Sequence, residues 1–199
     1  LIETVKLNEV IEVTPNISVK FTTNTHMLGS SSFSVYYKDL SARVHKLYYS
    51  GDLGDKDFSK VLTYDNQYPP NNCTIALVES TYGAREKNFV DKNLRKKELK
   101  ILEQTIENTI FNKGGCVLMP AFSMDRTEQL LYNLKNIIDN NDKLSKLKIV
   151  VEGKLTNDLI DIYEKVCEGD NKRIIDDILN WENLIRIRDY KDTVKILEE

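Results

Sequence analysis

The chain has 199 residues, of which 41% are hydrophobic and 30% are charged, a composition typical of a globular protein and unlike that of a disordered chain. Its 28 Lys and Arg against 31 Asp and Glu give a net charge of −3, which excludes a protein that coats nucleic acid by overall positive charge. The apolar runs are only a few residues long, so the sequence predicts no membrane-spanning helix.

The three cysteines are Cys73, Cys116 and Cys167, and no two of them form a Cys-x-x-Cys pair, which disfavours a thiolate zinc site. Each lies beside apolar residues, so the sequence predicts buried, reduced thiols. The sequence shows no secretion signal, and the expected compartment is the cytoplasm.

The residue pattern in the first third of the chain predicts β-strands. Apolar and polar residues alternate over residues 17–21 and 33–37, and a short apolar run at 47–49 stops at Ser50-Gly51-Asp52. A continuous apolar run at residues 74–78 predicts a strand that is buried on both faces.

From about residue 91 the pattern changes to alternating helices and strands. Apolar residues at helical spacing predict helices at residues 91–112, 127–139 and 157–168. A buried strand is expected at residues 116–119 and a further strand at 147–151, and this order predicts parallel βαβ units. We place a domain boundary near residues 84–90, which gives a β-rich domain of residues 1–86 and an open α/β domain of residues 87–199.

Three side chains next to predicted strands could carry chemistry. His26 lies between two predicted strands, where an imidazole could bind a metal or have a purely structural role. Asp52 follows a strand beside Gly51, where a carboxylate could bridge two metal ions or bond its own turn. Glu79 follows the run at 74–78 and could serve a functional site or cap a following helix. The second histidine, His45, lies among charged residues, and we expect it on an exposed turn.

Two further features lie in the second half of the chain. Arg126 lies between a predicted strand and a predicted helix, where it could hold a phosphate or pair with Asp125 or Glu128. The basic run at residues 92–100 is typical of a solvated helix face.

Four segments, in order and spacing, resemble one family, the β-CASP branch of the metallo-β-lactamase-fold nucleases. The segments are THMLGS at residues 25–30, YSGD at 49–52, VESTYG at 78–83 and GGCVLMPAFSMDRTEQLL at 114–131. The resemblance covers about residues 17–199. It implies the C-terminal part of a metallo-β-lactamase αββα sandwich followed by part of an open parallel α/β β-CASP domain.

The resemblance implies a role for each candidate residue. His26 matches a metal-ligand histidine, and Asp52 matches the aspartate that bridges two metal ions. Glu79 matches the acidic residue that opens the β-CASP region and supports the catalytic site. Substrate binding is expected at Ser123 and Arg126, although Asp125 stands where the family usually has glycine.

The implied activity is that of a metal-dependent phosphodiesterase. Two zinc ions would hold a hydroxide that attacks a phosphodiester of single-stranded RNA or DNA. The family's His-x-His-x-Asp-His segment and its later histidine motifs are not in this sequence, so we expect the chain to be an internal part of a longer protein and inactive alone.

Two other functions remain open from the sequence. A catalytically inactive β-CASP paralogue, acting as a nucleic-acid-binding or scaffolding subunit, also fits a sequence with only two histidines. A small-molecule hydrolase of the wider fold is disfavoured by the segment at 114–131. The expected partner is nucleic acid and not a membrane, and a homo-oligomer is compatible with the sequence.

Overall fold

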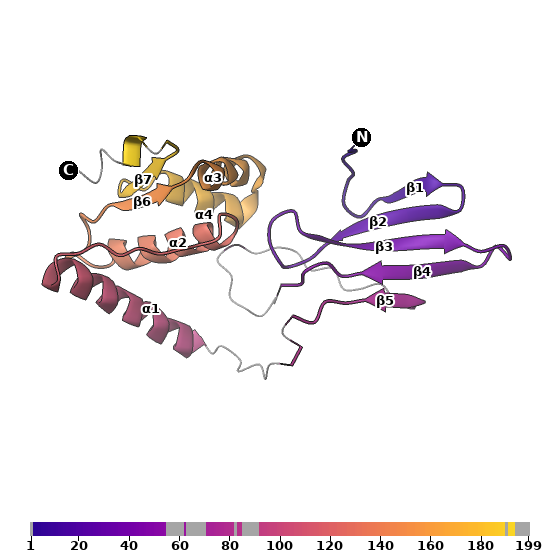
Figure 1. The fold of residues 1–199 in the computed structure, drawn as a ribbon, viewed down its shortest axis with the longest axis horizontal. Helices are drawn as coiled ribbons and strands as arrows, with labels where there is room; N and C mark the ends of the chain where they lie inside the picture. Colours follow the sequence, from indigo (N-terminus) through magenta and orange to yellow (C-terminus); the bar gives the residue numbers. More distant parts are fainter. Residues whose placement is uncertain are drawn as a thin grey trace. The chain divides into compact units, whose positions relative to one another are not determined.

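A computed structural model describes residues 2–54, 62, 71–81, 83–84, 92–189 and 191–193. The chain divides into two compact units (Figure 1). Unit 1 comprises Leu1–Ser59 and Thr63–Lys87, and unit 2 comprises Lys60–Leu62 and Asn88–Glu199. The predicted boundary between residues 86 and 87 lies outside the described residues.

Unit 1 contains a five-stranded sheet whose strands follow one another in chain order (Figure 1). The strands are β1 (Val10–Thr14), β2 (Ile17–Thr23), β3 (Ser31–Lys38), β4 (Val44–Tyr49) and β5 (Ile75–Leu77). Strands β1 to β4 pair antiparallel, and β5 pairs parallel to β4. The alternating segments predicted around residues 17–21 and 33–37 are thus confirmed as strands.

The register of this sheet places apolar side chains on one face. Phe21, Phe33, Tyr49 and Leu77 form a row across four strands. The ring centroids of Phe21 and Phe33 are 5.8 Å apart, and those of Phe33 and Tyr49 are 5.1 Å apart. The next row consists of Val19, Val35, Leu47 and Ile75. The period-two pattern of the sequence therefore becomes one apolar sheet face.

Strand β5 differs from its prediction in burial. The sequence predicts a strand buried on both faces, but Ile75 is 49% exposed and Leu77 is 50% exposed. Among the described residues, β5 is the last strand in the sheet order, so it has a strand neighbour, β4, on one side and none on the other.

His45 lies within β4, so the predicted exposed turn is wrong. Its ring stacks on Tyr37 with centroids 4.8 Å apart, and its Nε2 lies 2.9 Å from Asp39 Oδ2. This contact is the main reason that the pKa of Asp39 is lowered.

Unit 2 has the predicted alternation of helices and strands (Figure 1). Its elements are α1 (Lys92–Glu107), a π-helical turn η1 (Asn108–Asn112), α2 (Arg126–Asp139), β6 (Ile149–Glu152), α3 (Lys154–Val166), α4 (Gly169–Leu179) and β7 (Leu184–Ile187). Strands β6 and β7 pair in parallel, as the order of elements predicts. A core cluster is formed by Ile106, Leu134, Ile138, Leu144 and Trp181. None of the described helices is long and apolar enough to cross a membrane.

The buried strand predicted at residues 116–119 is wrong. This segment carries no strand in the described structure, and Leu118 is 88% exposed. Val117 and Met119 nevertheless pack against the core cluster, while Leu118 between them is exposed. The side chains therefore alternate as they would in a strand, although the segment pairs with no strand in the described structure. Cys116 is also exposed and Cys73 is half-buried, so of the three thiols only Cys167 has the predicted burial.

Candidate functional site

The sheet topology of unit 1 brings His26, Asp52 and Glu79 to the same end of the sheet. Strands β2 and β4 are each antiparallel to β3, and β5 is parallel to β4, so β2, β4 and β5 run in one direction. His26 follows β2, Asp52 follows β4 and Glu79 follows β5. The three residues therefore lie on loops at the carboxyl ends of three strands, where side chains far apart in sequence can meet.

Hydrogen bonds join these three loops. The Glu79 carboxylate accepts from the backbone N–H of Leu53 at 3.1 Å and from that of Thr81 at 2.9 Å. The hydroxyl of Thr25 donates to the carbonyl of Gly54 at 2.6 Å. The loop that carries Asp52 is therefore held on one side by Glu79 and on the other by the residue next to His26.

The approach of two loops explains why position 54 is glycine. A Cβ atom on Gly54 would lie 1.9 Å from the carbonyl oxygen of Thr25. No side chain fits this distance, so only glycine lets the two backbones come this close.

A buried polar network beneath the loops centres on Ser50, which the sequence analysis did not identify. The Ser50 hydroxyl accepts from the backbone N–H of Glu79 at 3.0 Å. Its carbonyl accepts from Asn24 Nδ2 at 3.3 Å and from the Ser32 hydroxyl at 2.6 Å. Ser32 in turn accepts from the Tyr48 hydroxyl at 3.1 Å. One buried serine thus connects the β5 loop to the β2 and β3 segments.

Asn24 links the His26 loop to this network. Its Oδ1 accepts from the backbone N–H of His26 at 3.2 Å, while its Nδ2 binds the Ser50 carbonyl. Asn24, Ser32 and Ser50 are all buried. Asn24 and Ser50 each lie two residues before a candidate site residue, but small polar residues indicate interior hydrogen bonding only once the strand register is known.

The carboxyl group of Glu79 is held in its charged form. Its pKa is lowered mainly by hydrogen bonds from Thr81, then by the Leu53 N–H, and least by the nearby imidazole of His26. Asp52 is exposed, whereas His26 and Glu79 are half-buried. Glu79 is therefore an ionised acceptor that fixes loops and is unsuited to act as a proton donor near neutral pH.

The site offers part of a metal-binding donor set. His26 and Asp52 carry donor atoms that zinc accepts. Among the described residues, however, no group of three or more His, Cys, Asp or Glu side chains is close enough to hold a metal ion. Because a zinc centre needs at least three protein ligands, these residues alone do not form one.

Ser123 and Arg126 lie in unit 2. Arg126 is the first residue of α2 and is exposed, and Ser123 is half-buried in the preceding loop. Asp125 has a φ of +63°, in the left-handed region that favours glycine, so the glycine usual in the family suits the backbone here. Its buried side chain accepts from Gln129 Nε2 at 2.5 Å.

Glu128 is a buried acid that sequence reasoning treated only as an ion-pair partner. It is 1% exposed, and neither carboxylate oxygen has a hydrogen-bond partner among the residues that the structure describes. Burial, and to a smaller extent the charge of Asp125, raises its pKa to about 7. Its neighbours Thr127 and Gln129 are polar and are also buried, so nothing in the local sequence indicates that Glu128 is buried.

Comparisons with known proteins identify relatives of the chain. It is 29% identical over 155 residues to the RNase J-like protein of Methanocaldococcus jannaschii, which covers 77% of this chain and 34% of that protein. It is 28% identical over 140 residues to Ribonuclease TTHA0252 of Thermus thermophilus, covering 70% of this chain and 30% of the ribonuclease.

A eukaryotic protein is also similar to the chain. Cleavage and polyadenylation specificity factor 73 of Drosophila melanogaster is 23% identical over 149 residues, which is 75% of this chain and 20% of that factor. No family model matches the chain. The chain spans about a third or less of the length of these three relatives. The chain is therefore similar in sequence to metallo-β-lactamase-fold, β-CASP nucleases, and its mixed α/β fold is consistent with part of such a protein.

Proposed function

We propose that this chain is part of a metal-dependent nuclease that hydrolyses phosphodiester bonds of single-stranded RNA or DNA. The observation that carries the proposal is the convergence of the His26, Asp52 and Glu79 loops at one end of the unit 1 sheet. The relatives are named as an RNase J-like protein, a ribonuclease and a cleavage and polyadenylation factor, and these names favour RNA.

In this proposal each residue has its own role. His26 and Asp52 would supply two ligands of a zinc centre, and further ligands would come from outside the described residues. A bound zinc ion would supply a Lewis acid and lower the pKa of a bound water. Glu79 would act as a positioning residue, because its carboxylate holds the Leu53 N–H and thereby the loop that carries Asp52. Ser123 and Arg126 would contact the substrate from unit 2.

The remaining expectations belong to the same proposal. Residues 1–86 would be part of a metallo-β-lactamase domain, and residues 87–199 part of a β-CASP domain. The complete protein would bind two zinc ions, act in the cytoplasm and form a homo-oligomer.

A test uses the protein expressed from its complete reading frame. Asp52→Asn keeps the side-chain shape but weakens the metal ligand, so cleavage of an end-labelled single-stranded RNA should fall by about a hundredfold or more. Asp142→Asn, a change at an exposed aspartate of unit 2, is the matched control and should cleave normally. Full activity of Asp52→Asn would contradict the assignment of this site.

One observation favours a second candidate, a non-catalytic subunit. The whole sequence has two histidines, and the described residues form no group of three metal-binding side chains. A complete protein that binds RNA, retains no zinc after dialysis and cleaves nothing would support this alternative. Zinc bound in proportion to protein, together with cleavage, would exclude it.

A further inference from the structure

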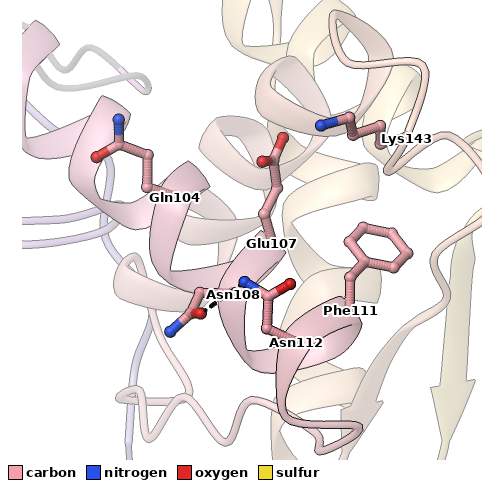
Figure 2. Close-up of a pocket in the computed structure, with 6 residues that line it drawn as sticks. All are labelled: Gln104, Glu107, Asn108, Phe111, Asn112 and Lys143. Carbon is pink, nitrogen blue, oxygen red and sulfur yellow. Dashed lines mark hydrogen bonds between the residues drawn. The ribbon is translucent and has the colours of Figure 1, made fainter.

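A pocket of about 520 Å³ lies in unit 2 on one side of α1 and the π-helical turn η1 (Figure 2). It is lined by Gln104, Glu107, Asn108, Phe111, Asn112 and Lys143. This volume is within the range of ligand pockets, and the pocket is separate from the residues assigned to catalysis above. The π-helical turn is itself a departure from regular helix that is common at functional sites.

The pocket combines an aromatic ring with polar groups that have no partner in the described structure. Phe111 is 54% exposed, and Figure 2 shows its ring on the same side as Lys143. Asn112 Nδ2 donates to Asn108 Oδ1 at 2.9 Å, which leaves one amide acceptor and one amide donor free on adjacent turns. No hydrogen bond or ion pair within the described residues engages the side chains of Gln104 and Lys143.

A stripe of two lysines, beside the acidic Glu103, continues from the pocket along α1. Lys97 and Lys100 precede Gln104 by seven and four residues, so all three lie on one helix face. Lys100 pairs with Glu103 at 2.6 Å, whereas Lys97 is exposed and has no ion pair with another described residue. The stripe thus offers cations on both sides of the pocket, Lys97 along α1 and Lys143 across it.

We propose that this surface binds single-stranded RNA, with one unpaired base stacked on Phe111 and the neighbouring phosphates at Lys97 and Lys143. An exposed ring can stack a base, and carboxamides can pair with the donor and acceptor on one base edge. The Glu107 carboxylate, held by Asn141 at 2.7 Å, can accept from a base amino group or a ribose hydroxyl.

This chemistry favours an unpaired nucleotide over the alternatives. An acidic peptide would bring its carboxylates close to Glu107, whereas a nucleotide offers Glu107 a base amino group or a ribose hydroxyl. A duplex keeps the faces of its bases stacked inside the helix and cannot offer one to Phe111. The choice of RNA rests in part on the proposed function, but the surface itself requires no hydrolysis.

The test measures binding of the chain to a fluorescent oligoadenylate about ten nucleotides long, by anisotropy in EDTA. Phe111→Ala should weaken binding by about tenfold, Phe111→Leu should weaken it similarly because the ring is lost, and Phe111→Tyr should retain it. Leu155→Ala removes a 66% exposed apolar side chain elsewhere in unit 2 and should bind normally. Circular dichroism checks that every variant is folded.

The lysines give an independent readout. Lys97→Gln and Lys143→Gln should each lower the slope of log affinity against log salt by about 0.7, whereas Lys165→Gln, on exposed α3 surface, should leave it unchanged. Equal effects of Phe111→Ala and Leu155→Ala, or no binding at all, would overturn the proposal. Binding of an acidic peptide or an RNA duplex that depends equally on Phe111 would also overturn it.

Because the assay contains no free metal, its outcome is separate from that of the cleavage test. Binding that depends on Phe111 supports this surface even if Asp52→Asn cleaves normally. Loss of cleavage in Asp52→Asn with no effect of Phe111 on binding leaves the nuclease proposal standing and removes this surface.

Discussion

At the scale of single residues, Glu128 has the strongest electrostatic consequence. Its pKa is about 7 in the folded chain against 4.5 for the free side chain. Between these values the folded chain binds the proton more tightly than the unfolded chain, so the free energy of unfolding falls as pH rises. Below about pH 4 Glu128 is protonated in both the folded and the unfolded chain. Above pH 7 it is ionised in both, so the destabilisation from its buried charge no longer changes with pH.

Glu128→Gln should remove this pH dependence. At about pH 8 the variant should be more stable than the parent by up to about 3 kcal/mol, and near pH 4 the two should be alike. Urea unfolding followed by circular dichroism across pH measures the difference. Glu182→Gln, at an exposed position, is the control and should follow the parent. An unchanged slope in Glu128→Gln would show that this carboxyl is ionised in the folded state.

Gly54 tests the close approach of the two loops. Gly54→Ala forces a Cβ onto the Thr25 carbonyl, so unfolding free energy should fall by about 1–3 kcal/mol, and by more where the backbone cannot shift. Gly115→Ala is the control, because its Cβ would lie 3.7 Å from Thr109 Cγ2, an ordinary contact. Equal stability of the two variants would contradict the tight packing at Gly54.

At the scale of elements, the buried hydroxyl of Ser50 connects strand ends that carry the candidate site. Ser50→Ala removes the acceptor of the Glu79 N–H, which should cost about 1–3 kcal/mol and speed hydrogen exchange at that amide. Ser34→Ala, at a similarly buried serine of β3, is the control and should leave exchange at Glu79 unchanged. NMR measures hydrogen exchange at the Glu79 amide. Equal exchange rates in the parent and in Ser50→Ala would mean that the hydrogen bond from the Glu79 N–H to the Ser50 hydroxyl is not maintained in solution.

At the scale of the whole molecule, the apolar face of the unit 1 sheet is an exposed hydrophobic surface within the described part of the chain. Tyr49, Ile75 and Leu77 on this face are each 45–50% exposed. Contiguous exposed apolar surface on a sheet favours association with another apolar surface.

The isolated chain should therefore self-associate as its concentration rises. Leu77→Lys places a charge on the apolar face and should bring the mass measured by light scattering toward that of a monomer. Val44→Lys, on the opposite face of β4, should associate like the parent. A parent chain that stays monomeric at all concentrations tested would contradict this prediction.

The sequence by itself determined the elements whose residues repeat at a regular period. The alternation in β2 and β3 and the helical spacing in α1, α2 and α3 specify which side chains share a face, because that spacing is local. The candidate residues His26, Asp52 and Glu79 were proposed from the sequence, because each lies after a predicted strand in a motif that resembles a known family.

Only the tertiary structure decided which of these residues meet and which are buried. The parallel pairing of β5 with β4 brings Glu79 to the Asp52 loop and leaves Ile75 exposed, and neither result can be read from an apolar run. The burial of Glu128 and Ser50 likewise depends on neighbours distant in sequence. Periodicity is a property of one segment, so the sequence predicts it. Burial and hydrogen bonding depend on contacts between separate segments, so the sequence alone does not predict them.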